Sequence, residues 1–333
     1  MKTKKKFQDK YITYLILVLM FVVALVMVKT GIASRKFQSW LVPICVNIIL
    51  AVSLNLTIGF LGELTLGHAG FMSVGAYAGC LFSQLMADIL PTVVRFPFAM
   101  LVGGLVAALF GVLVGIPVLR LKGDYLAIVT LAFGEIIRSV IINLNFTGGA
   151  AGLKGTPQDS NFYIAFAVVM ITVILITNLT ESGQGRSIKA IRDNRIAAEA
   201  CGINVTYYRL LAFVFAAFFA GVAGVLYGHN LSILNAGTFD YNKSIEILVL
   251  VVLGGLGSIR GSVISATILY VLPELLRPLA DYRMIMYSIV LIVIMILNSS
   301  EQFSSVRELL NVKNALNHLK SKKNGKEEVA GDE

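Results

Sequence analysis

Long, continuous runs of apolar residues fill most of the chain and are separated by short polar segments. Most runs are about 20 residues long, the length with which a helix crosses a hydrocarbon core of about 30 Å. They do not alternate between apolar and polar residues, as the strands of a membrane barrel would. The pattern therefore predicts an all-α, polytopic membrane protein with about ten transmembrane helices. The predicted spans are 11–28, 41–59, 65–87, 98–118, 125–145, 162–179, 210–229, 244–258, 262–279 and 284–298.

Composition agrees with a protein that is mostly embedded in lipid. Hydrophobic residues make up 57% of the chain and charged residues 14%, whereas a soluble domain carries roughly 25% charged residues. The net charge of +9 comes from residues at the termini and in loops, so it predicts contact with membrane lipid and no nucleic-acid partner. The three cysteines form no CxxC pair and the three histidines no HExxH motif, so no metal site is predicted.

The first apolar run follows the basic stretch MKTKKKFQDK and could be a signal peptide, because Gly31-Ile32-Ala33 resembles a cleavage site. The uncharged stretch 11–28 is, however, longer than a usual signal core, and further spans follow it. We therefore expect an uncleaved first helix.

The basic residues predict the orientation of the chain. With the amino terminus in the cytoplasm and spans alternating, most Lys and Arg residues fall on the cytoplasmic side, which is the expected bias. The exceptions are Lys29, Arg35, Lys36, Arg95, Lys154, Lys243, Arg277 and Arg283 outside, and Arg138 within a span. Both termini are then cytoplasmic. The predicted organisation is a basic amino terminus (1–10), a transmembrane domain (11–300) with a cytoplasmic loop at 181–209, and a cytoplasmic tail (301–333).

One charged stretch, GRSIKAIRDNRIAAEACGI (185–203), interrupts the apolar pattern and falls on the cytoplasmic side. As a single helix it would align Arg192, Arg195 and Glu199 with Ile188 on one stripe. Small residues would line the opposite face, and Gly202 would end the helix in a left-handed cap. It lacks the broad oily face of a membrane-surface helix, so we expect it to dock against another protein; a solvated connector is the alternative. The candidate docking residues are Arg192, Asp193, Arg195, Ala197, Glu199 and Gly202.

Polar residues at the start of the third span are candidates for a transport pathway. Glu63, Thr65 and His68 lie beside glycines, where an interrupted helix can expose polar groups to a water-filled cavity. A hydrogen-bonded structural role is the alternative for His68. Gly75 and Gly79 in the same span are expected to allow close helix packing.

The fifth predicted span contains two opposite charges, Glu135 and Arg138, which are three residues apart and so share a helix face. An unpaired charge within a span is costly. We therefore expect a mutual ion pair, which either fastens neighbouring spans or places one of its members on the pathway. The glycine-rich stretch TGGAAGLKGTP follows on the outer side and is expected to be a loop too flexible for a helix, which either contacts a delivery protein or merely turns the chain.

The sequence lacks the common motifs of nucleotide hydrolysis and catalysis. No GxxxxGK[ST] motif is present, and GGLGSIRGS does not have its lysine spacing. No set of nucleophile, base and orienting group stands out. The chain is therefore not expected to be an enzyme or to bind a cofactor itself.

Four segments, taken in order, resemble a known family. They are LTLGHAGFMSVGAYAG, GDYLAIVTLAFGEIIR, GRSIKAIRDNRIAAEACGINVTYYRLLAFVFAAFFAGVAGVLYG and LVVLGGLGSIRGSVISATIL. Together they resemble the LivM-type permease subunits of branched-chain amino acid ABC importers, over roughly Asn47 to Leu276. The resemblance implies a bacterial cytoplasmic-membrane importer with a second, related permease, two cytoplasmic ATPase subunits that use ATP, and an extracytoplasmic substrate-binding protein. It also implies that Ala197 to Gly202 matches the loop that grips the ATPase.

The expected function is thus ATP-driven import of Leu, Ile or Val by alternating access. Two alternatives stay open: an ABC permease for urea or short amides, and a passive channel for a small solute. A channel does not need a docking helix on its cytoplasmic side, and this feature disfavours it. A membrane-embedded enzyme is disfavoured because no catalytic set is present.

Overall fold

The computed structural model describes residues 2–29, 35–121 and 123–275, and the single residues 285, 288, 289 and 292. The α-helices are α1 (Lys2–Lys29), α2 (Arg35–Asn55), α3 (His68–Leu85), α4 (Thr92–Val118), α5 (Asp124–Asn143), α6 (Phe162–Glu181), α7 (Gly183–Asp193), α8 (Arg195–Ala200), α9 (Val205–Gly228), α10 (Tyr241–Gly254) and α11 (Ile259–Leu275). The shorter elements are a π-helix, η1 (Leu56–Leu61), three 3₁₀ turns, η2 (Asn145–Thr147), η3 (Gly149–Ala151) and η4 (Ala236–Phe239), and two strands, β1 (Leu153–Lys154) and β2 (Ile233–Leu234).

These elements confirm an all-α membrane protein. Each predicted span up to 262–279 overlaps a helix, while 284–298 and the tail lie almost wholly outside the described residues. Five helices of the described part are long and apolar enough to cross a membrane, and the segment Thr13–Val28 is a shorter apolar helix. The chain divides into two compact units, Met1–Leu272 and Pro273–Glu333, and everything below concerns the first.

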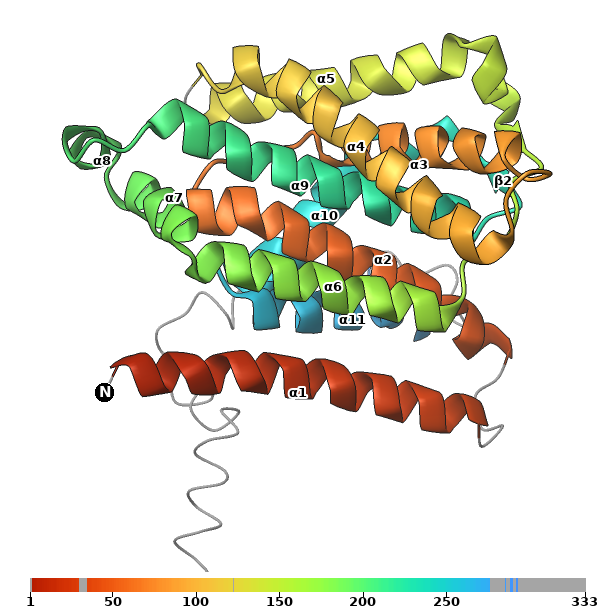
Figure 1. Cartoon of the computed structure of the whole chain (residues 1–333), viewed down its shortest axis with the longest axis horizontal. Coiled ribbons are helices and arrows are strands. Elements are labelled where there is room, and N and C mark those ends of the chain that lie inside the picture. The colour runs from red at the N-terminus through yellow and green to blue at the C-terminus, as the bar shows by residue number, and fades with distance from the viewer. Residues whose placement is uncertain are drawn as a thin grey trace, which may run out of the picture. The chain divides into compact units, whose positions relative to one another are not determined.

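The centre of the first unit is built from α3, α4 and α9, which run side by side (Figure 1). Their backbones approach so closely that a Cβ on Gly75 of α3 would overlap the backbone of Gly221 of α9. A Cβ on Gly79 would likewise meet Val225, and one on Gly103 of α4 would meet the carbonyl of Gly75. The predicted close packing at Gly75 and Gly79 is confirmed, because small residues let membrane helices touch along their backbones.

The passage from α2 to α3 is an interrupted helix. The span Phe37–Leu61 ends in η1, and Gly62 then adopts a left-handed conformation with φ 82°. Non-helical chain follows until α3 begins at His68, three residues after the predicted start of the span. His68 is hydrogen-bonded to Ser53, which lies about 12 Å before the end of the span at 1.5 Å per residue. The chain therefore turns back into the bundle before α3 starts.

A second short helix begins beside the start of α3. Asp240 caps α10 by accepting a hydrogen bond from the amide of Lys243 (3.0 Å). One turn later, the hydroxyl of Ser244 accepts a hydrogen bond from the amide of Ala69 (3.2 Å). The first turns of α3 and α10 thus lie together inside the protein.

The glycine-rich stretch after α5 is a loop that contains short regular elements. It contains η3 and strand β1, which pairs antiparallel with β2 in the register Leu153 with Leu234 and Lys154 with Ile233. As expected, the stretch forms no α-helix, and Gly148, Gly149 and Gly152 adopt positive φ values that shape its tight turns.

Orientation can be tested with the exposed Cys201, whereas Cys45 and Cys80 are buried. We expect Cys201 to be cytoplasmic and Lys154, which is also exposed, to be on the outer side. On intact cells an impermeant maleimide should label Lys154→Cys in a Cys201→Ser background and leave Cys201 of the parent unlabelled until the membrane is permeabilised. The reverse labelling pattern would invert the orientation.

Candidate functional site

The charged stretch forms two short helices rather than the single one expected. Asn194 is extended (φ −158°, ψ 106°) and separates α7 from α8. Its side-chain oxygen accepts a hydrogen bond from the amide of Ala197 (3.0 Å). The single-helix prediction was wrong because asparagine makes a better amino-terminal cap than an interior helix residue. We call α7 and α8 together the coupling element.

The break changes some of the expected neighbours and preserves others. Arg195 and Glu199 form the expected ion pair (3.3 Å), and Gly202 is left-handed (φ 80°) as expected. Ile188, expected on the charged stripe, is instead buried. Arg192 is paired with its neighbour Asp193 (3.2 Å) and not with the residues of α8. The predicted continuous stripe therefore does not exist.

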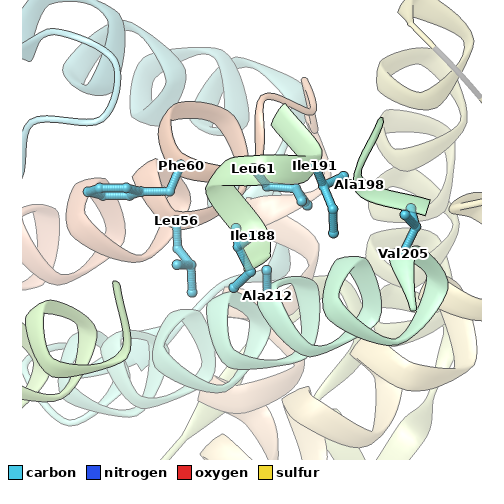
Figure 2. Close-up of a cluster of buried hydrophobic side chains, with 8 residues drawn as sticks. All are labelled: Leu56, Phe60, Leu61, Ile188, Ile191, Ala198, Val205 and Ala212. Atoms are coloured by element: carbon cyan, nitrogen blue, oxygen red, sulfur yellow. The ribbon is translucent and has the colours of Figure 1, made fainter. Parts of the chain in front are cut away.

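A buried hydrophobic cluster fastens the coupling element to the membrane-spanning helices (Figure 2). Ile188 of α7 lies beside Leu56 of η1 and Ala212 of α9, and Ala198 of α8 belongs to the same cluster. The full set is Leu56, Phe60, Leu61, Ile188, Ile191, Ala198, Val205 and Ala212. Fully burying a valine, leucine, isoleucine or phenylalanine side chain contributes about 1.5–3 kcal/mol. The coupling element is thus seated on η1 and α9.

A lysine adds polar contacts to this seat. The ammonium of Lys189 donates a hydrogen bond to the carbonyl of Thr180 at the end of α6 (2.8 Å). It also lies 5.2 Å from the centre of the Phe60 ring, within the range of a cation–π interaction. The hydrophobic cluster and Lys189 were missed in the sequence, although the spacing of Ile188 and Ile191 on one helix face signals a buried side.

The opposite side of the coupling element is open. Asp193, Ala197 and Glu199 are exposed, and Ile196 is 80% exposed. A large aliphatic side chain surrounded by charges and small residues is a common composition for a protein interface. Ile196 was not predicted as a contact residue. The sequence did contain a signal for its exposure, because this large aliphatic residue stands between the charged Arg195 and the small Ala197.

Glu63, in the non-helical segment between η1 and α3, forms an ion pair with Arg209 of α9. Arg209 also donates a hydrogen bond to the carbonyl of Leu121 (3.3 Å) and to that of Leu119, the residue after α4. Burial raises the pKa of Glu63, and the guanidinium of Arg209 opposes that rise. Arg209 was missed as a site residue, although an arginine in an apolar helix without a nearby acidic residue requires a distant partner.

The other two predicted pathway residues of this segment are hydrogen-bonded inside the bundle. Nε2 of His68 lies 2.8 Å from the hydroxyl of Ser53. The hydroxyl of Thr65 lies 3.4 Å from that of Thr57, a weaker contact. These contacts account for the burial of both residues, and a role in transport stays a prediction.

The charged pair of α5 has the predicted geometry. Nε of Arg138 donates to Glu135 (2.8 Å), and Nη2 lies 2.7 Å from the same carboxylate oxygen. Both side chains are 29% exposed, and the bond stays within α5. In the described residues it does not link neighbouring spans. A partly open charge pair on an apolar helix is expected to face water or another subunit rather than lipid.

No metal-binding group of three or more His, Cys, Asp or Glu side chains is found in the described ranges. The candidate site consists of the three charged features described above. They are the coupling element, the Glu63–Arg209 pair beside it, and the Glu135–Arg138 pair on α5. They can dock a partner and position a polar solute, and none of them is a catalytic arrangement.

Sequence comparison identifies the family. The family described as "Branched-chain amino acid transport system / permease component" matches residues 36–298. The chain is 32% identical to the high-affinity branched-chain amino acid permease protein LivM of Escherichia coli, over 81% of this chain and 70% of that protein. It is 32% identical to LivM of Salmonella typhimurium over 80% and 70% of the two chains, and 32% identical to the permease protein LivH of the same organism over 34% and 36%. The chain therefore belongs to the family of permease components of branched-chain amino acid transport systems.

Proposed function

We propose that this chain is the membrane-spanning permease subunit of an ATP-driven importer that carries Leu, Ile or Val across a bacterial cytoplasmic membrane by alternating access. Its expected partners are a second, related permease, two cytoplasmic ATPase subunits and an extracytoplasmic substrate-binding protein. The occurrence of LivM and LivH as distinct permease proteins in one organism supports a related partner. The names of both relatives support the cargo.

The coupling element is the observation that carries this proposal. It is anchored through Ile188 and Ile191 and presents Ile196 and Glu199 outward. A passive channel has no need for such an anchored, outward-facing element. An ATPase that pushes on it would transmit force directly to η1 and α9, because the seat is hydrophobic and buried.

The pair on α5 supports an amino acid as the cargo. A free amino acid carries an ammonium and a carboxylate close together, and Glu135 and Arg138 offer the complementary charges three residues apart on one helix. Glu63, Thr65 and His68 are proposed to contribute polar groups to the same route, beside the point where α3 and α10 begin.

The proposal is tested by adding bulk to the exposed face of the coupling element. Ala197→Trp should block close approach of the ATPase, and Glu199→Arg should reverse the charge of the exposed face and replace the Arg195 ion pair by like-charge repulsion. We expect uptake and copurification of the ATPase to fall by about tenfold or more, since each 1.4 kcal/mol lost is tenfold in affinity. Ala151→Trp is the matched control, because Ala151 is exposed in η3, outside the coupling element.

Insertion of every variant into the membrane is measured first. If Ala197→Trp and Glu199→Arg insert normally and retain full uptake and ATPase association, α8 is a solvated connector. The case for an energy-coupled importer over a channel would then lose its main support.

A further inference from the structure

Two glycine-rich segments that are far apart in the sequence contact each other, and one of them also contacts the coupling element. The first is Gly59 in η1, and the second is Gly257 in the turn between α10 and α11. A Cβ on Gly59 would overlap the backbone nitrogen of Gly257 and the side-chain oxygen of Asn55. The two backbones are therefore in direct contact, and no other residue fits at position 59 without movement.

Asn55 holds this contact from the side of α2. Its side-chain oxygen accepts a hydrogen bond from the amide of Gly257 (2.9 Å). Its side-chain nitrogen donates to the hydroxyl of Ser262 in α11 (2.9 Å). Asn55 and Ser262 are both fully buried. A buried amide group that loses its hydrogen-bond partner costs free energy, because it is left unsatisfied. The two hydrogen bonds of Asn55 therefore resist separation of α2 from the α10–α11 turn.

Arg192 holds the contact from the side of the coupling element. Its Nη1 donates a hydrogen bond to the carbonyl of Gly59 (2.9 Å). The methylene groups of Arg192 lie against Gly62, where any Cβ would meet them. The side chain is 41% exposed, so its guanidinium reaches from the open surface to the π-helix. Arg192 was predicted to contact the ATPase, and its position favours a different role.

The segment in the middle is a π-helix, a form that is rare and frequently found at functional sites. Gly59 therefore has three neighbours that belong to different parts of the permease. They are Arg192 of the coupling element, Asn55 of α2 and Gly257 of the α10–α11 turn.

We propose that Arg192 is a positioning residue that makes the coupling element, η1 and the α10–α11 turn move as one unit. In this arrangement a displacement of α7 by the ATPase is passed to α10, whose other end lies beside the start of α3. The inference rests on the proposed function for its role in transport. The mechanical link itself does not depend on the cargo.

The first experiment separates docking from transmission in the complete transporter, reconstituted with its permease, ATPase and binding-protein partners. Arg192→Met keeps the packing against Gly62 and removes the hydrogen bond to Gly59. We expect uptake and the stimulation of ATP hydrolysis by loaded binding protein to fall by about tenfold, the size of one lost charged hydrogen bond. Copurification of the ATPase and its basal hydrolysis should stay within about twofold of wild type. Arg192→Lys, which can still donate to Gly59, should recover part of the stimulation.

Arg120→Met is the charge-matched control, because Arg120 is an exposed arginine after α4 that lines a cavity with Arg195 and Arg209 but makes no hydrogen bond to η1 in the described part of the chain. It should leave the stimulation unchanged. Normal stimulation in Arg192→Met would overturn the proposal. So would loss of ATPase copurification in that variant, because Arg192 would then be a docking contact.

The second experiment does not require transport. Hydrogen–deuterium exchange of the purified permease should increase in Arg192→Met both at residues 56–61 and at residues 255–258, and should not change in Arg120→Met. Faster exchange confined to α7 would disprove the link. If wild type shows no ATP-dependent uptake, the proposed function fails, while this experiment still decides whether the three segments form one unit.

Discussion

Replacing Gly75 by valine is expected to destabilise the helical bundle strongly. Any Cβ at this position overlaps the backbone of Gly221, so α3 and α9 must separate. Neither backbone can turn away as a flexible side chain could, and the same contact brings Gly103 of α4 against the carbonyl of Gly75. We expect a loss of about 3 kcal/mol or more, at the upper end of overpacking effects. This corresponds to a melting temperature lower by about 10 °C in detergent.

Ala78→Val is the matched control, one turn further along the same helix. Ala78 lines an apolar cavity of about 360 Å³ between α3, α4 and α5, with Tyr77 and Phe133 among its neighbours. The added methyl groups have room there, so the melting temperature should change little. Equal losses in Ala78→Val and Gly75→Val would mean that β-branching in α3, rather than the contact with Gly221, causes the effect.

The membrane-spanning helices could be predicted because their signal is local. Apolar runs of the right length must become helices in lipid, and the predicted spans overlap α1 to α6 and α9 to α11. The boundaries were less accurate where a helix is interrupted. The late start of α3 at His68 depends on Gly62 adopting a left-handed turn and on the contact of His68 with Ser53. That contact joins two helices and leaves no periodic trace in the sequence.

In the candidate site, too, interactions within one helix could be predicted from the sequence, and interactions between separate segments could not. The pairs Arg195–Glu199 and Glu135–Arg138 could be predicted because their partners are one helical turn apart. The pairing of Glu63 with Arg209 could not, since no periodicity relates residues from separate helices. The break at Asn194 had a local signal, because an asparagine three residues before Ala197 can cap a new helix. The prediction of one continuous helix over the whole stretch did not take this signal into account.

The meeting of Gly59 with Gly257 shows most clearly what sequence periodicity leaves out. Glycine-rich segments at both places were visible, but glycine is abundant in this chain, with 30 residues. The contact of the two segments depends on the hydrogen bonds of Asn55 to Gly257 and Ser262. A buried asparagine in an apolar helix is the one local hint that a distant polar partner exists.

Glu135→Gln is expected to damage both assembly and uptake, because it leaves Arg138 without its carboxylate on an apolar helix. The cost of one unpaired charge near the bilayer centre is about 2.5–3.5 kcal/mol, and the pair is only partly open, with each side chain 29% exposed. Adding Arg138→Gln removes the unpaired charge. The double variant should therefore insert and assemble better than Glu135→Gln alone, as measured by the amount of monodisperse permease and its melting temperature.

Uptake distinguishes a structural pair from one that lines the pathway. If Glu135 and Arg138 bind the ammonium and carboxylate of the amino acid, the double variant should regain assembly while uptake stays at least about tenfold below wild type, since each missing charged hydrogen bond costs about 1.5–3 kcal/mol. The matched comparison is Arg195→Gln combined with Glu199→Gln, which removes an ion pair of the same charges outside the membrane and should spare substrate affinity measured by equilibrium binding. Full recovery of uptake together with assembly would assign the α5 pair to folding alone, and damage equal to the sum of the two single variants would show that the two residues do not depend on each other.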